Sequence, residues 1–100
     1  MIIQLHDQPD GIHKHLENTL LDISISSQEA FEIIVHPETY MQIVGERDKN
    51  FILNRLPTGD ITFMHIPLSR EEDFEQGKAM IRLRGKSYPF QNPNKIKSFW

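Results

Sequence analysis

The sequence contains no cysteine, and no apolar run approaches the about 20 residues that a membrane-spanning helix needs. The lack of cysteine excludes disulfides, thiolate metal sites and cysteine nucleophiles, and it is typical of a reducing compartment. The N-terminus also lacks the basic and then apolar pattern of a secretory leader. We therefore expect a soluble protein of the cytoplasm, or of a particle assembled there, with no membrane partner.

Acidic residues are absent from residues 78–100, although the chain as a whole has a net charge of −3. This segment holds six basic side chains, whereas residues 1–77 hold 14 acidic side chains against five basic ones. Such an asymmetry is typical of a surface that meets a charged partner, including an acidic patch on a second copy of the same chain.

The motifs of common catalytic sites are absent as well. Gly85-Lys86 would fit a phosphate-binding loop only with glycine at position 80, which is Met80. No Gly-x-Ser-x-Gly elbow, His-Glu-x-x-His pair or dinucleotide-binding glycine triplet occurs. The carboxylates of residues 71–75 lie in a highly charged run, where exposure makes a carboxyl group a poor general acid. We expect no enzymatic activity and no cofactor.

The stretch from Ala30 to Gly45 organises the prediction. Residues 31–36 are rich in β-branched and aromatic side chains, which favours a largely buried strand. Pro37 favours extended backbone at the residue before it and suits the first turn of a short helix near 37–45. The alternative is a helix over 27–35, because Ser26 and Glu29 form a capping box.

The first part of the chain predicts a short strand within residues 1–6 and then an amphipathic helix over residues 11–22. Ile12, Leu16 and Leu20 recur on one helical face, and Asp10 is a suitable N-cap residue.

The second half predicts a hairpin from two β-rich segments, 51–56 and 61–66, around a Pro/Gly turn, with Pro67 ending the second strand. A capping box at Ser69 predicts a short polar helix near 70–76. Residues 79–84 alternate apolar and basic side chains, which predicts a half-exposed strand with a basic outer face.

Together these elements predict an α+β fold in which a small, mostly antiparallel sheet of four or five strands carries one main amphipathic helix. A single domain is expected over residues 1–86, followed by an extended basic and aromatic arm over residues 87–100. The periodic apolar positions predict this core: Ile12, Leu16, Leu20, Phe31, Ile33, Val35, Ile61, Phe63, Ile81 and Leu83.

One cluster near the N-terminus has metal-ligating residue types. His13 and His15 point apart on a helix, whereas His13 and Glu17 share a face and would need a third ligand from His6 or Asp7. Because that third ligand and its supporting shell are not evident, we interpret these side chains as solvated surface and expect no tightly bound metal.

The basic segment with interleaved aromatic residues is the candidate partner-binding site. The residues concerned are Arg82, Arg84, Lys86, Tyr88, Phe90, Lys95, Lys97, Phe99 and Trp100. A protein partner, either a second copy or a larger assembly, would cover the aromatic side chains while the charges stay hydrated. The alternative is a small regulatory or nucleic-acid-binding module, in which the same residues track phosphates and stack bases.

A strand followed by His36-Pro37-Glu38-Thr39-Tyr40 and a short helix, and then Gly59-Asp60-Ile61-Thr62-Phe63 running to Ile66-Pro67, resembles the axial domain of tailed-phage capsid proteins of the HK97 type. The resemblance covers about residues 30–84. The chain departs from the family in having no room for the long spine helix, peripheral domain and extended arm. The resemblance implies a structural protein of a virion, as a small capsid-associated or capsid-derived subunit, and no catalytic residue transfers with it.

Overall fold

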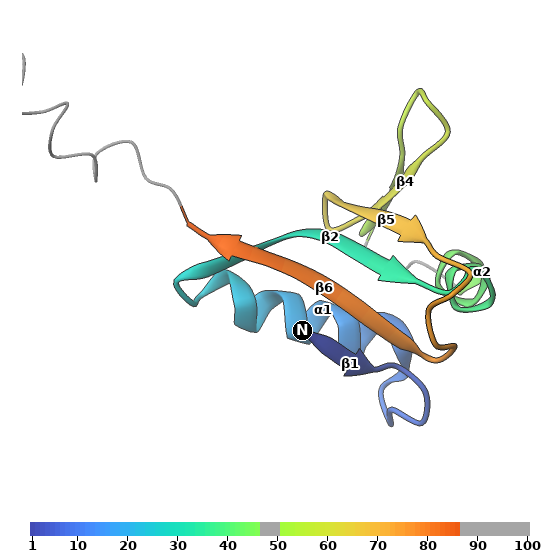
Figure 1. Ribbon diagram of the computed structural model, residues 1–100, viewed down its shortest axis with the longest axis horizontal. Coiled ribbons are helices and arrows are strands. Elements are labelled where there is room, and N and C mark those ends of the chain that lie inside the picture. The colour runs from blue at the N-terminus through green and yellow to red at the C-terminus, as the bar shows by residue number, and fades with distance from the viewer. Residues whose placement is uncertain (47–50, 87–100) are drawn as a thin grey trace, which may run out of the picture.

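The computed structural model describes residues 1–46 and 51–86, which form a six-stranded sheet packed with two helices (Figure 1). The elements are β1 Ile2–Gln4, α1 Gly11–Ser24, β2 Gln28–Val35, α2 Pro37–Gly45, β3 Leu53–Arg55, β4 Ile61–Phe63, β5 Ile66–Arg70 and β6 Lys78–Gly85. The sheet order is β1-β6-β2-β5-β4-β3; β2 and β5 pair in parallel, and the other four pairs are antiparallel. The predicted α+β class is confirmed, with six strands instead of four or five.

β2 lies in the middle of the sheet, between β6 and β5. It pairs with β6 over most of its length and with β5 over Ile33–Val35, so its C-terminal half has backbone partners on both sides. The side chains of Ile33 and Val35 are completely buried. The strand predicted over residues 31–36 is therefore confirmed, although it begins earlier, at Gln28, and ends at Val35, and the alternative helix over 27–35 is wrong. A strand gains two hydrogen-bonded neighbours here, which outweighs the local capping-box signal.

α2 begins where the sequence predicts, directly after β2. Pro37 occupies the first helical turn, and the Nδ1 atom of His36 accepts a hydrogen bond from the backbone N–H of Glu38 at 3.0 Å. Thr39 and Ile43 point inward and are buried. The Thr39 hydroxyl also accepts a hydrogen bond from the N–H of Gly77 at 2.9 Å, which ties α2 to the turn before β6.

α1 covers one face of the sheet (Figure 1) and is two residues longer than predicted. Leu16, Leu20 and Ile23 lie on its buried side and join the core. Asp10 stands at the N-cap position, as predicted, although its side chain makes no capping hydrogen bond.

The predicted hairpin is confirmed as β3 and β4, but its second strand is shorter than expected. Met64 and His65 both adopt positive φ values, 51° and 66°, and turn the chain into β5. Two consecutive left-handed residues match the tight hairpin turns that follow the twist of the strands. Pro67 therefore does not end a strand; it lies inside β5, opposite Thr62.

The short helix predicted near 70–76 is wrong. Arg70 belongs to β5, and the N–H of Glu71 donates to the carbonyl oxygen of Val35 at 2.8 Å, which continues the parallel ladder with β2. The Ser69 hydroxyl, the expected helix cap, donates to Glu32 Oε2 at 2.7 Å instead. The segment offers one apolar side chain, Phe74, so a helix there would have had no buried face to stabilise it.

The core contains six of the ten predicted residues as buried side chains: Leu16, Leu20, Ile33, Val35, Phe63 and Ile81. Ile12, Ile61 and Leu83 are half-buried and pack against this core. Phe31 does not belong to it, because the β2–β6 register shifts between Ala30 and Glu32.

Two glycines with left-handed backbones provide a matched test of the packing between β1 and the turn before β6. Gly77 has φ +80°, and a Cβ atom there would lie 2.6 Å from the His6 ring, whereas Gly59 has φ +93° and open space around it. We expect Gly59→Ala to cost about 1 kcal/mol of unfolding free energy, from backbone strain alone. Gly77→Ala should cost clearly more, and urea unfolding measures the difference. Equal losses would mean that the His6 ring moves aside freely.

Candidate interaction surface

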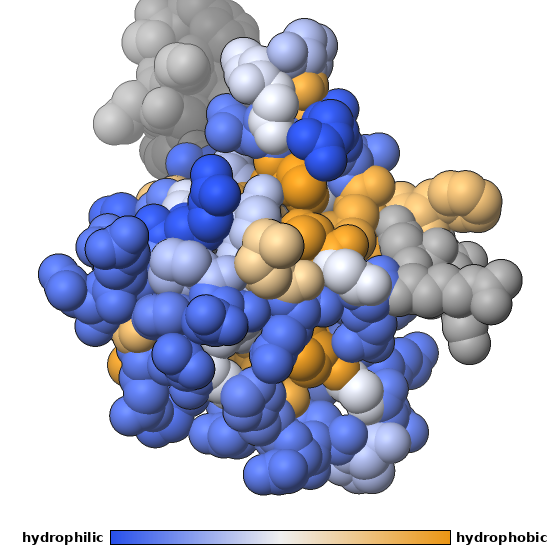
Figure 2. All heavy atoms as spheres, turned by 90° about the vertical axis from the view of Figure 1, so that its right-hand side faces the viewer, coloured by the Kyte–Doolittle hydropathy of each residue, from blue (hydrophilic) through white to orange (hydrophobic). Residues whose placement is uncertain are grey.

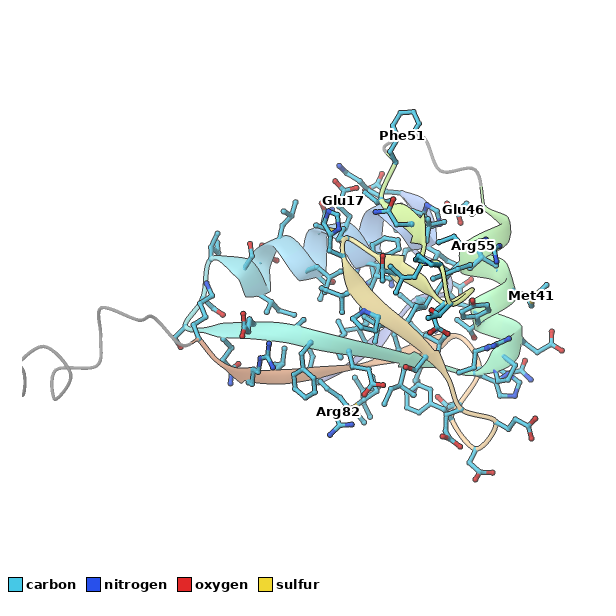
Figure 3. The ribbon with its side chains drawn as sticks, turned by 90° about the horizontal axis from the view of Figure 1, so that it is seen from above. Glu17, Met41, Glu46, Phe51, Arg55 and Arg82 are labelled. Atoms are coloured by element: carbon cyan, nitrogen blue, oxygen red, sulfur yellow. The ribbon has the colours of Figure 1, made fainter. Side chains whose placement is uncertain are left out.

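The face of the sheet opposite α1 is not covered by a helix within the described residues. In Figure 3, α1 lies on one side of β2 and β6, while the Arg82 side chain points away on the other side. We call this surface the open sheet face. It is formed by the side chains that alternate with the core residues along the strands: Ile2, Glu29, Phe31, Glu32, Ile34, Ser69, Met80, Arg82 and Arg84.

A β-bulge places Phe31 on the open sheet face. Ala30 pairs with Leu83 and Glu32 pairs with Arg82, so Phe31 is the extra residue of β2. A bulge leaves two successive side chains on the same side of a strand, which breaks the alternation from which burial of Phe31 was predicted. The guanidinium carbons of Arg82 and Arg84 lie 5.2 and 5.3 Å from the centre of its ring. At an exposed site, each such cation–π contact contributes about 0.5–1 kcal/mol.

The same two arginines form cross-strand ion pairs with β2. Arg84 Nε lies 2.7 Å from Glu29 Oε1, and one Arg82 terminal nitrogen lies 3.1 Å from Glu32 Oε1. Each pair joins residues that are direct partners in the sheet register. Both pairs are partly exposed, so each adds little to stability, but together they leave this band of the surface electrically neutral.

An apolar row crosses the strands beside the charged band. Ile2, Met80 and Ile34 are in register across β1, β6 and β2, and their side chains share the open sheet face. Ile2 is 56% exposed, and the other two are half-buried. The open sheet face thus has two parts. One is the apolar row, and the other is a neutral band in which two ion pairs surround the ring of Phe31.

Three of the predicted partner-binding residues lie within the described part of the chain. Arg82 and Arg84 are on the open sheet face. Lys86 follows β6: its N–H donates to the Ser27 carbonyl oxygen at 3.0 Å, and its ammonium group donates to the Ser24 carbonyl oxygen. The other predicted residues lie outside the described residues: Tyr88, Phe90, Lys95, Lys97, Phe99 and Trp100.

The sequence alone did not predict that Glu29, Phe31 and Glu32 belong to this surface. Their residue types alone do not indicate a binding surface. The two glutamates are typical of solvated surface charges, and Phe31 is typical of a core residue. Pairing β2 with the basic strand 79–84 in antiparallel register would have placed the acids opposite the arginines. Only the position of the bulge would then have been needed to turn Phe31 outward.

The candidate metal ligands near the N-terminus are already engaged with other groups. His13 is buried, contrary to the solvated surface predicted for it, and its Nε2 atom lies 2.6 Å from the Ile43 carbonyl oxygen. Facing a carbonyl oxygen, that nitrogen must be the donor. His6 Nε2 lies 3.0 Å from Gln42 Oε1 on α2. Within residues 1–46 and 51–86, no three ligating side chains are grouped as a metal ion would require.

The α2 end of the molecule offers a weaker candidate surface. Figure 2 looks at this end, where hydrophilic residues cover most of the surface and apolar atoms show in patches between them. Met41 and Phe51 are 64% and 87% exposed, and Figure 3 shows them pointing outward from separate places. Scattered exposed apolar side chains are normal on a soluble surface, so they do not define a site.

Comparison with known proteins gives no match to a family model, to a curated protein or to a solved structure. Neither described helix is both long enough and apolar enough to cross a membrane. The features that bear on function are therefore the geometry of the open sheet face and the C-terminal sequence.

A charge exchange tests whether the ion pair between Glu29 and Arg84 is made in solution. Arg84→Glu should lower the unfolding free energy by up to about 1 kcal/mol, because it sets two like charges opposite each other and removes one contact with Phe31. Adding Glu29→Arg should recover part of that loss by restoring a pair of reversed polarity. Urea unfolding of the two single variants and the double variant measures the coupling, and strictly additive effects would contradict the pair.

Proposed function

We propose that this chain is a non-enzymatic structural protein that works by assembly, making protein–protein contacts through the open sheet face and the C-terminal segment. Its partner is a second copy of itself or a larger assembly. Its proposed setting is the virus particle, as a minor capsid-associated component. That setting rests on the resemblance of residues 30–84 to the HK97-type axial domain, and the proposal of assembly does not depend on it.

The main support for the proposal is that the acidic and basic side chains of the open sheet face neutralise one another. Burying an unpaired charge against a protein partner is costly, whereas a charge that already has its counter-ion beside it is less so. The arginines of β6 are paired in this way, and an apolar row lies beside them. A surface of apolar side chains with satisfied polar groups is what protein interfaces bury at their centre.

The same pairing weighs against the nucleic-acid alternative. A phosphate-binding surface needs basic side chains that are free to displace counterions. On β6, Arg82 and Arg84 are paired with glutamates of β2, and Lys78 lies 2.6 Å from Glu75. The described residues carry 13 acidic against seven basic side chains, a field that repels a polyanion.

We assign no catalytic role to any residue. The carboxylates of the open sheet face are the counter-ions of arginines, and a hydrogen bond from Ser69 engages Glu32 further.

Two methionine substitutions test the proposal with the same change of side chain. Met80→Glu places a charge in the apolar row, and we expect it to weaken self-association in sedimentation experiments by at least about tenfold, because removing the water around a charge at an interface costs more than about 1.4 kcal/mol. Met41→Glu makes the same change on the exposed side of α2 and should leave association unchanged.

Circular dichroism should show both variants folded. Association that survives Met80→Glu at full strength would remove the open sheet face from the interface. A wild-type chain that stays monomeric, yet binds single-stranded DNA or RNA with a steep salt dependence, would replace the proposal with the nucleic-acid alternative.

A further inference from the structure

The edge of β6 beyond β1 is open within the described part of the chain. β1 pairs with residues 78–80, and the ladder closes at Ile81, whose N–H donates to the Met1 carbonyl oxygen at 2.7 Å. In an antiparallel ladder, alternate residues direct both backbone groups to the same side. Leu83 and Gly85, two and four residues beyond Ile81, therefore present N–H and C=O groups toward the side on which no described residue pairs with them.

An apolar groove runs directly beside this edge, between α1 and the sheet. It measures about 450 Å³, and its apolar walls are Met1, Ile3, Ile23 and Leu83. Asp22 on α1 adds an exposed negative charge to its lining. An exposed strand edge with an adjoining apolar groove is the arrangement that captures an extended peptide: the edge pairs with the backbone, and the groove takes alternate side chains.

The composition of the C-terminal segment complements this groove, because the segment is both apolar and basic. Residues 87–100 contain five large apolar side chains, Tyr88, Phe90, Ile96, Phe99 and Trp100, together with two lysines and no acid. The described residues carry six more acidic than basic side chains, so charge favours contact with the segment. Residues 94–100 contain no proline and can supply every backbone donor that pairing requires.

The segment also starts at the groove. Lys86 is held to Ser27, and the neighbouring residues Ser26 and Gln28 line the groove. At about 3.3 Å per residue, 14 residues span up to about 45 Å, enough to cross to an adjacent copy and pair there.

We propose that residues 87–100 of a second copy add to the β6 edge as an extra strand and place their apolar side chains in the groove. The start of the segment, after Lys86, and the groove lie at the same end of β6. Two copies related by a two-fold axis can therefore exchange their segments reciprocally and form a closed dimer. The choice of a second copy follows from the proposed assembly, because the segment is long enough to reach an adjacent copy and its basic side chains complement the acidic surplus of the described residues. This inference rests on the proposed function, since it names the contact that the C-terminal segment makes in that assembly, beside the contact of the open sheet face.

The sole tryptophan of the chain, Trp100, reports on the segment without any label. In the full-length protein we expect its emission to shift to shorter wavelength as concentration rises, in step with dimer formation in sedimentation equilibrium. Dilution should return the emission to that of tryptophan in water.

Gly85→Pro removes one edge-facing N–H and keeps the β2-facing donors of Arg84 and Lys86. Gly85→Ala is its matched control, because a Cβ atom there meets nothing within 4 Å. The proline variant should weaken association by about five- to tenfold, the cost of one lost hydrogen bond, while the alanine variant behaves like wild type.

A second pair of variants tests the groove without touching the sheet. Asp22→Lys reverses the charge in the groove lining, whereas Asp10→Lys makes the same change at an exposed position before α1. We expect only the first to weaken association, and to do so less at high salt.

Three outcomes would overturn the inference, and they differ from one another. Short-wavelength emission from a monomer at all dilutions would place the segment on its own chain. Undiminished association in both Gly85→Pro and Asp22→Lys would leave assembly intact but locate the contact elsewhere. A chain that never associates, with water-like Trp100 emission throughout, would contradict the proposed function as well.

Discussion

The double pairing of β2 positions every other part of this fold. On one side β6 runs antiparallel to it, and on the other β5 runs parallel, so the hydrogen bonds of β2 link residues far apart in the chain. Ile33 and Val35 project from this strand toward α1 and are fully buried. A single bulge at Phe31 resets the register, and it decides which side chains face the core and which form the open sheet face.

Much of this architecture follows from local sequence. The X-Pro restriction at His36 and the β-branched run before it identified both β2 and α2, and the apolar stripe identified α1. The failed helix near residues 70–76 has its cause in pairing between distant segments. Ser69 has the pattern of a helix cap, but a parallel partner held its segment extended. Met64 and His65 carry no glycine signal, yet they turn the chain within the hairpin that joins β4 to β5.

In the candidate site too, the features that depend on local sequence could be predicted and those that depend on strand pairing could not. The alternation of residues 79–84 was enough to place Arg82 and Arg84 on an outer face, and the structure has both there. Whether those arginines were free or paired could not be predicted, because their partners Glu29 and Glu32 lie about 50 residues away and are brought opposite them only by the β2–β6 register. That pairing changes the chemistry of the surface from a cationic strip to a neutral face. Such a face suits a protein partner better than a nucleic acid.

Amide hydrogen exchange at Leu83 tests most directly whether this chain assembles through β6. In a dilute monomer the Leu83 N–H points to the open edge and should exchange quickly, whereas the Arg84 N–H, directed to β2, should stay protected. The account predicts that protection at Leu83 rises with protein concentration while protection at Arg84 stays constant. Rapid exchange at Leu83 at every concentration at which the protein associates would contradict it.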